Sequence, residues 1–229
     1  MKRALSFLLA AILLLLAGCG NTDTPISTDS AQQSSSVSDS EKSTGNQDTE
    51  ANTEEATGIL VIYFSRTGEQ YNVDVIDKGN TAIVAEMIAL ETGAELFEVL
   101  PEEDYYPYTY NELTDVARKE QSENARPAYQ GELPDLSAYG TVFVGAPVWW
   151  GDWPMILYTV FENNDFSGKT LIPFCTHEGS GLSGFDKKLG SVCPDAEVLK
   201  GLAIRGQDAQ NNQEKTREAV QDWLTELGF

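Results

Sequence analysis

Short apolar runs alternate with longer segments of mixed character from residue 58 to the end of the chain. The apolar runs are nearly continuous, which is typical of strands buried on both faces of a parallel sheet. The runs that predict strands are Ile59–Phe64, Glu95–Val99, Thr141–Ala146, Thr170–Cys175 and Val198–Ile204. The segments that predict helices are Thr81–Glu91, Asn111–Glu123, Met155–Glu162, Ser183–Ser191 and Asn211–Leu227. This alternation predicts an α/β domain with a doubly wound, five-stranded parallel sheet and helices on both faces.

The first 57 residues follow a different pattern. A basic start is followed by an apolar run, Ala4–Leu16, that is too short to span a bilayer comfortably. The small residues that lead into Cys19 resemble the lipobox of bacterial lipoproteins, in which the peptide is cleaved before the cysteine and the cysteine carries lipid. An ordinary secretory signal with an incidental cysteine is the alternative.

Residues 20–57 are rich in Ser, Thr, Asp, Gln and Glu and contain almost no large apolar residues. Such a segment cannot bury enough surface to offset its chain entropy, so we expect a disordered tether. The predicted organisation is therefore a signal peptide over 1–18, a lipidated Cys19 with its tether over 19–57, and one domain over 58–229. This organisation predicts an extracytoplasmic protein, lipid-anchored to the outer face of the bacterial cell membrane.

Charge narrows the range of partners. The chain carries a net charge of −21, and the domain, with 28 acidic and 12 basic residues, accounts for −16 of it. A surface this acidic repels nucleic acid and anionic lipid, so no nucleic-acid partner is expected. It favours a basic partner or a neutral ligand, and an anionic ligand needs a dedicated local site.

The number and spacing of the cysteines and the histidine do not predict a metal-binding site. Besides Cys19, only Cys175 and Cys193 are present, and either a disulfide between them or two separate thiols is compatible with the sequence. His177 is the only histidine and no two cysteines lie close together, so no metal site is expected.

Three of the predicted strands, the first, third and fourth, end in unusual sequence. In the strand order 2-1-3-4-5 the carboxyl ends of these strands meet at the point where the order reverses, which is where ligands bind in such sheets. The candidate binding residues that follow the three strands are Ser65, Arg66, Thr67, Gly68, Asn80 and Thr81; Pro147, Val148, Trp149, Trp150, Gly151 and Asp152; and Thr176, His177, Glu178, Gly179, Ser180 and Gly181.

The first loop has the features of a phosphate site. Hydroxyls, a glycine and the free N–H groups at a helix start favour an anion, with help from the helix dipole. The loop lacks the lysine of GxxxxGK[ST] and lacks GxGxxG, so it suits a terminal monophosphate rather than a triphosphate or a dinucleotide. The alternative is a capped helix start with Thr81 as N-cap.

The second and third loops suit a flat ring. Trp149, Trp150 and Trp153 lie within five residues, and exposed tryptophans favour a flat apolar ligand, although a core-packing or partner-facing patch is the alternative. The glycine- and serine-rich third loop can bring its backbone to the edge of a ring. A monophosphate pocket beside an aromatic wall and a polar backbone edge suits flavin mononucleotide (FMN).

The domain resembles the flavodoxins across nearly its whole length. Tyr63–Gly68 followed by Asn80–Thr81 is similar to their phosphate loop, although residues 69–79 intervene here. Trp150–Asp152 falls where flavodoxins have the loop whose glycine carbonyl turns toward flavin N5 on reduction, and Thr176–Leu182 matches the loop on the other side of the ring. A branch of flavodoxin-like proteins, often extracytoplasmic, shares the insert together with a Trp-Trp-Gly-Asp loop.

The resemblance implies FMN as cofactor and a low-potential electron carrier whose partner is a redox protein or a small electron acceptor. No catalytic side chain is assigned, since the cofactor carries the chemistry. An FMN-dependent reductase of quinones or other small acceptors is the alternative, and a non-redox ligand-binding protein on the same fold is a second one. His177 as proton donor or plain loop residue, and Asp152 and Glu178 as general acids or charges, stay open.

Two features have no assigned place. The insert, 69–79, could form a small hairpin or lie against the domain. Several tyrosines follow the second predicted strand. They could form the edge of a binding site, but the favoured interpretation is that they pack the long connection between this strand and the next helix onto the domain. These are Tyr105, Tyr106, Tyr108, Tyr110 and Tyr129.

Overall fold

The computed structural model describes residues 56–229. The predicted signal peptide, the lipidation site Cys19 and all but the last two residues of the tether lie outside the described residues. The helices found between residues 56 and 229 are too short or too polar to span a bilayer.

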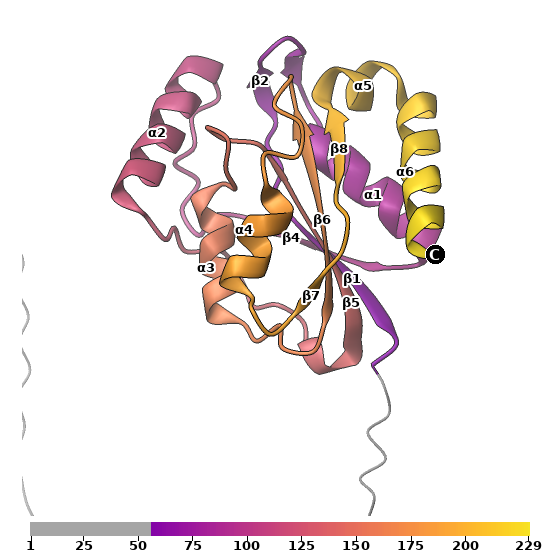
Figure 1. The fold of residues 1–229 in the computed structure, drawn as a ribbon. Helices are drawn as coiled ribbons and strands as arrows, with labels where there is room; N and C mark the ends of the chain where they lie inside the picture. Colours follow the sequence, from indigo (N-terminus) through magenta and orange to yellow (C-terminus); the bar gives the residue numbers. More distant parts are fainter. Residues whose placement is uncertain (1–55) are drawn as a thin grey trace, which may run out of the picture. The chain divides into compact units, whose positions relative to one another are not determined.

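A parallel sheet forms the centre of the domain (Figure 1). Its strands run in the order β4-β1-β5-β6, and β7 and β8 both pair with the free edge of β6. This confirms the predicted order 2-1-3-4-5. The strands are β1 (Gly58–Tyr63), β4 (Glu95–Glu98), β5 (Tyr139–Pro147), β6 (Thr170–His177), β7 (Glu197–Val198) and β8 (Leu202–Arg205).

Helices cover both faces of the sheet, which explains why its strands are apolar on both sides (Figure 1). Val61, Phe143 and Phe174 pack toward one helical layer, and Leu60 and Val144 pack toward the other. The first layer is α1 (Asn80–Thr92), α5 (Gly206–Asn211) and α6 (Gln213–Leu227). The second is α3 (Met155–Asn163) and α4 (Phe185–Val192), with α2 (Tyr110–Glu123) next to α3.

The fifth strand differs from the prediction. Instead of one strand over Val198–Ile204, β7 pairs with Thr170 and Leu171 of β6, and β8 pairs with β6 from Phe174 onward. Pro173 lies at the gap, and a proline has no N–H to donate to a neighbouring strand. Gly201 lies close to this point, and a Cβ there would be 2.8 Å from the Pro173 carbonyl oxygen.

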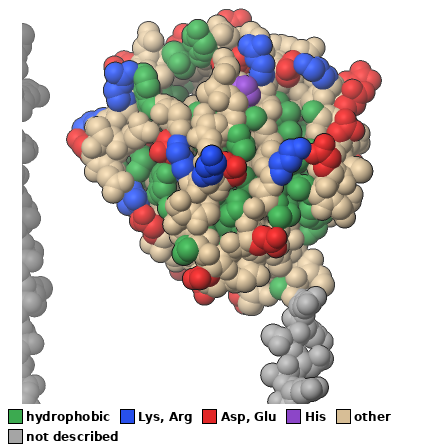
Figure 2. All heavy atoms as spheres, viewed as in Figure 1, with side chains coloured by type: hydrophobic (Ala, Val, Ile, Leu, Met, Phe, Trp, Pro, Cys, Tyr) green, Lys and Arg blue, Asp and Glu red, His purple; other side chains and the backbone are tan. Residues whose placement is uncertain are grey.

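Two further elements differ from the prediction or extend it. The last predicted helix, Asn211–Leu227, is present as α6, which begins at Gln213, and a short helix that was not predicted, α5, precedes it. The insert forms an antiparallel hairpin of β2 (Gly68–Gln70) and β3 (Asp74–Ile76), one of the two possibilities left open, and a short 3-10 turn, Leu136–Ala138, precedes β5. On the face shown in Figure 2, basic side chains are scattered among acidic ones.

Candidate functional site

The carboxyl ends of β1, β5 and β6 lie side by side and are tied to one another. The Phe64 N–H donates to the Gly145 carbonyl oxygen over 2.9 Å, and the Val148 N–H donates to the Thr176 carbonyl oxygen over 2.9 Å. The buried hydroxyls of Thr81 and Thr176 are 2.8 Å apart. The three loops singled out in the sequence therefore meet at one edge of the sheet.

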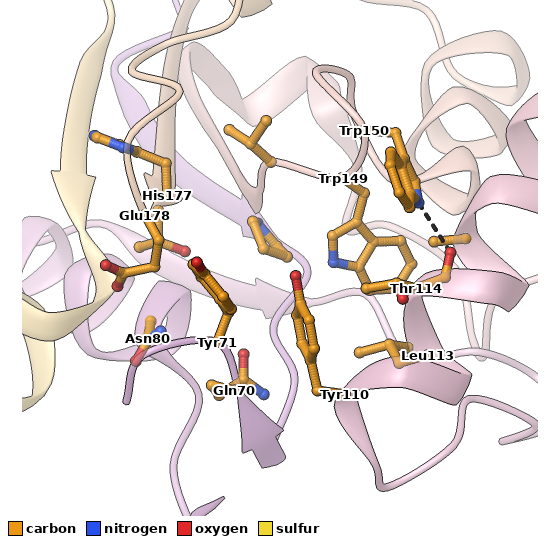
Figure 3. Close-up of a pocket in the computed structure, with 14 residues that line it drawn as sticks. Gln70, Tyr71, Asn80, Tyr110, Leu113, Thr114, Trp149, Trp150, His177 and Glu178 are labelled. Carbon is orange, nitrogen blue, oxygen red and sulfur yellow. Dashed lines mark hydrogen bonds between the residues drawn. The ribbon is translucent and has the colours of Figure 1, made fainter. Parts of the chain in front are cut away.

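A cavity of about 220 Å³ opens at this edge (Figure 3). Eight of the eighteen candidate residues line it: Asn80, Pro147, Val148, Trp149, Trp150, Thr176, His177 and Glu178. The other ten belong to the same three loops without lining it: Ser65, Arg66, Thr67, Gly68, Thr81, Gly151, Asp152, Gly179, Ser180 and Gly181.

The first loop closes tightly on the start of α1. The N-cap position of α1 is Gly79, not Thr81, and the cap comes from far away in the sequence, since Ser65 Oγ accepts from the Ala82 N–H over 3.0 Å. Within residues 56–229, the first two N–H groups of the helix, those of Asn80 and Thr81, have no acceptor. They are available to an anion at the positive end of the helix dipole.

The Arg66 side chain turns away from this loop. Its guanidinium lies 3.1 Å from Asp104 Oδ1, donates to the Tyr106 carbonyl oxygen over 2.8 Å and lies over the Tyr106 ring. The loop therefore offers neutral donors rather than a cation. Thr67 is exposed, and Gly68, with a φ of +89°, begins the hairpin.

The second loop is a tight turn. Trp149 and Asp152 exchange two backbone hydrogen bonds of 2.9 Å each, and Trp150 and Gly151 between them have φ values of +50° and +74°. Positive φ at both central positions is the pattern of a type I′ turn, which favours glycine at one of them.

The three tryptophans of this region have three different environments. The Trp149 ring lines the cavity and packs edge-on against Phe64, with centroids 5.3 Å apart. Trp150 turns toward α2, where its Nε1 donates to the Thr114 carbonyl oxygen over 2.9 Å and Arg118 lies 3.7 Å from its ring. Trp153 is buried and stacks on Phe185 in the core, which is the alternative kept open for this residue.

Asp152 fixes the turn to its neighbours. Its Oδ1 accepts from the Trp153 N–H over 2.8 Å and from the Tyr158 hydroxyl over 3.0 Å, and it lies 3.1 Å from Lys188 Nζ. Burial, followed by the charge of Asp152, raises the pKa of Tyr158. The same Lys188 donates to the Gly151 carbonyl oxygen over 2.5 Å, so α4 holds the turn from outside the cavity.

His177 organises the third loop. Its Nδ1 accepts from the N–H groups of Gly179 and Gly181 over 2.8 and 3.2 Å. Both glycines have positive φ, which lets the chain curl around the imidazole. Burial lowers the pKa of His177, with Arg205 acting in the same direction and Glu178 against it. A neutral imidazole is the form that can accept these two hydrogen bonds.

Glu178 is paired within the protein. Its Oε1 accepts from the Gln207 N–H over 2.8 Å, and its Oε2 lies 3.5 Å from Arg205 Nη2. Gly206 passes so close that a Cβ there would be 2.3 Å from Asn80 Nδ2 and 2.8 Å from Glu178 Oε1. The carboxylate thus binds the start of α5 while lining the cavity.

Six lining residues were not among the candidates. Four form one stripe of α2 with the spacing i, i+3, i+4, i+7: Tyr110, Leu113, Thr114 and Ala117. This spacing is the signal that could have found them. The other two, Gln70 and Tyr71, come from the insert, and no sequence pattern places them at the cavity.

Of the other tyrosines after β4, Tyr106 is buried and Tyr129 packs against Phe97, whereas Tyr105 and Tyr108 are exposed. The hydroxyls of Tyr105 and Tyr106 both donate to the buried carboxylate of Glu120, which fastens the connection after β4 to α2. Burial raises the pKa of Glu120, opposed by these two hydrogen bonds, and burial raises the pKa of Tyr106.

The described residues provide no evident metal centre. Among residues 56–229, no group of three or more His, Cys, Asp and Glu side chains is placed to hold a metal ion. In the part of the chain that the structure describes, Cys175 and Cys193 are buried and form no disulfide.

Comparison with known proteins gives one family and several structures. A family model described as flavodoxin matches residues 58–227. A candidate flavoprotein of Bacteroides uniformis is 30% identical with a TM-score of 0.60, covering 74% of this chain and 99% of its own. A candidate flavoprotein of Bacteroides eggerthii is 27% identical with a TM-score of 0.59, covering 76% and 99%.

A third structure shares the fold at lower identity. It is a flavoprotein of Lactobacillus acidophilus in complex with FMN, 23% identical with a TM-score of 0.53, covering 69% of this chain and 98% of its own. A search of curated proteins gives no significant match.

Proposed function

This chain belongs to the flavodoxin family, and we propose that it binds FMN at the carboxyl ends of β1, β5 and β6 and carries electrons at low potential. The observation that carries the proposal is the position of the Asn80 and Thr81 N–H groups, which have no acceptor among residues 56–229, beside a cavity walled by Trp149. The FMN complex of the Lactobacillus acidophilus flavoprotein, which has the same fold, supports it.

The phosphate end of FMN fits the first loop. The N–H groups of Asn80 and Thr81 and the hydroxyls of Ser65 and Thr67 would hold it at the start of a 13-residue helix. Since Arg66 is engaged elsewhere, its guanidinium supplies no cation to this part of the site. Neutral donors and a helix dipole suit a monophosphate.

The ring end fits the cavity. Pro147, Val148 and Trp149 give it an apolar surface, and Thr176, His177 and Glu178 give it a polar edge. Apolar lining with a few convergent polar groups is the usual composition of a cofactor site. When bound, FMN would supply the one- or two-electron redox chemistry.

The protein's own residues would set the electrostatics. A carboxylate about 4 Å from a second negative charge opposes it by about 1 kcal/mol in water and about 4 kcal/mol near a protein surface. The acidic domain, with Glu178 at the cavity, therefore resists added negative charge, although Arg205 offsets part of the Glu178 charge. Any turn of the Gly151 carbonyl toward the cavity must first break its hydrogen bond to Lys188.

A reductive titration tests the carrier role. Protein loaded with FMN is reduced stepwise and followed by its absorption spectrum. The proposal expects two separate one-electron steps. A single two-electron step would rule out a one-electron carrier.

We further propose that lipid on Cys19 anchors the protein to the outer face of the bacterial membrane. The Leu-Ala-Gly-Cys order at residues 16–19 supports this. The wild type should partition with membranes, and Cys19→Ser should release the protein or leave it with an uncleaved signal. Equal release of wild type and variant into the soluble fraction would contradict the anchoring proposal.

An FMN-dependent reductase is the second candidate. The observation that favours it is the stripe of α2, whose Leu113 and Ala117 give the cavity an apolar lining beyond the three loops that suits a small apolar acceptor. Steady turnover of a quinone with a nicotinamide donor would support a reductase. Protein that remains colourless after incubation with FMN would instead support a non-redox binding protein.

A further inference from the structure

We infer that the insert, residues 69–79, is part of the binding site: it carries Tyr71 to the cavity, where Tyr71 and Tyr110 form a stacking surface for the planar ring of the ligand. This inference rests on the proposed function and deepens it, since it names ring-binding residues on an element outside the three loops. We use the name strap for the insert from here on.

The first observation is the position of the two rings. Tyr71 and Tyr110 both line the cavity, and their rings stack with centroids 5.5 Å apart and an angle of 29° between their planes. Figure 3 shows them side by side between His177 and Trp149. Tyr71 is 53% exposed, and an aromatic ring left this open at a cavity mouth has a face available to a flat ligand.

The second observation is that the strap is fastened on its α2 side. The Glu69 N–H donates to the Tyr108 carbonyl oxygen over 3.0 Å, and Glu69 Oε2 accepts from the Tyr110 N–H over 2.9 Å. Both bonds lie beside the Tyr71–Tyr110 stack. They fix the position of the strap relative to the start of α2, which holds the two rings together.

The strap is fastened on its α5 side as well. Gln207 Nε2 donates to the Asn72 carbonyl oxygen over 2.8 Å, and Gln210 Nε2 donates to the Lys78 carbonyl oxygen over 2.7 Å. The strap therefore crosses from α2 to α5 at the cavity. An insert that only decorated the surface would not need ties to two elements on either side of it.

The strap also has the backbone of a defined hairpin. Asn72 and Asp74 adopt φ values of +59° and +78°. Asparagine and aspartate are the side chains that tolerate the left-handed region best after glycine. The turn therefore holds Tyr71, its first residue, directly after β2.

Affinity for FMN tests the two tyrosines. We expect Tyr71→Ala and Tyr110→Ala each to raise the Kd for FMN about tenfold, since stacking on an aromatic ring contributes about that factor. Tyr71→Phe should restore wild-type affinity because the ring remains. Val75→Ala is the matched control, as Val75 is an exposed residue of the same strap that does not line the cavity, and it should leave the Kd unchanged.

A spectroscopic readout accompanies the affinity. Stacked aromatic rings quench flavin fluorescence, so FMN bound to Tyr71→Ala should fluoresce more than FMN bound to the wild type. Tyr71→Leu replaces this variant should Tyr71→Ala fail to fold. Unchanged affinity and unchanged fluorescence in folded Tyr71 variants would overturn the inference while leaving FMN binding intact.

Gln207 is a positioning residue, and a double-mutant cycle tests it. Gln207→Ala should weaken FMN binding in the wild type but have no further effect in Tyr71→Ala, because it acts through the strap. Equal effects in both backgrounds would contradict this. If wild-type protein binds no FMN at all, the proposed function fails, and this inference fails with it.

Discussion

Replacing Gly79 with alanine tests how closely the first loop packs on the start of α1. Gly79 has a φ of −64° and a ψ of 147°, which alanine adopts freely, so any loss must come from steric contact. The new Cβ would lie 2.1 Å from Ser65 Oγ, 2.7 Å from the Arg66 carbonyl oxygen and 2.9 Å from the Arg66 nitrogen. The Ser65 hydroxyl can rotate, but the two backbone atoms move only if the loop moves.

The expected loss has two parts. Overpacking of this kind costs about 1–3 kcal/mol, and rotation of Ser65 also breaks its hydrogen bond to the Ala82 N–H, at about 0.5–1.5 kcal/mol. We therefore expect Gly79→Ala to lower the free energy of unfolding by about 2–4 kcal/mol and to weaken FMN binding. Urea unfolding and FMN titration measure the two effects.

Gly190→Ala is the matched control. Gly190 lies inside α4, and a Cβ there would touch only Val198 Cγ2 at 3.7 Å, an ordinary contact. The same substitution should stabilise the protein by about 0.5–1 kcal/mol, because glycine disfavours a helix interior. Gly79→Ala with wild-type stability and wild-type FMN affinity would refute the account of the first loop.

Much of the fold is predictable from local pattern. Continuous apolar runs such as Ile59–Phe64 can only be covered on both faces, which implies a parallel sheet between two helical layers. The strand order then brings the ends of the first, third and fourth strands together, and the tie between Thr81 and Thr176 follows from that topology. The hydroxyls, glycines and tryptophans at those strand ends are apparent in the amino-acid sequence itself.

The remainder of the site depends on contacts between distant segments. Tyr71 reaches the cavity only because Gln207 and Tyr108 hold the strap, and no local pattern records those partners. Glu178 looks like a free acid in the sequence, yet the Gln207 N–H and Arg205 engage it. Pro173 is the exception among these distant contacts, because a proline within the fourth predicted strand is visible in the sequence and explains why the neighbouring fifth strand is split.

Three further predictions concern stability and reactivity. Because burial raises the pKa of Glu120 above its ordinary value of 4.5, the native state binds this proton more tightly than the unfolded state. The unfolding free energy of the wild type, relative to Glu120→Gln, should therefore be highest below pH 4.5 and fall as the pH rises past the raised pKa; urea titrations with a pH-independent difference would contradict this. Asp152→Ala should lower the unfolding free energy by about 1–3 kcal/mol, since one carboxylate serves the turn, Tyr158 and α4, and an unchanged urea midpoint would argue against that role. Burial raises the pKa of Cys175 to about 12 and that of Cys193 to about 11, so peptide mapping should find both unlabelled by a thiol reagent in the native protein and labelled in urea; fast native labelling would show that they are accessible.

The most direct test of the FMN site compares FMN with riboflavin, which has the same ring but no phosphate. Isothermal titration of the purified protein with each flavin gives the two dissociation constants. Hydrogen bonds from the Asn80 and Thr81 N–H groups to a charged phosphate are worth about 1.5–3 kcal/mol each, so FMN should bind on the order of 100-fold more tightly or better. Equal affinity for the two flavins, or no binding of FMN, would contradict the assignment.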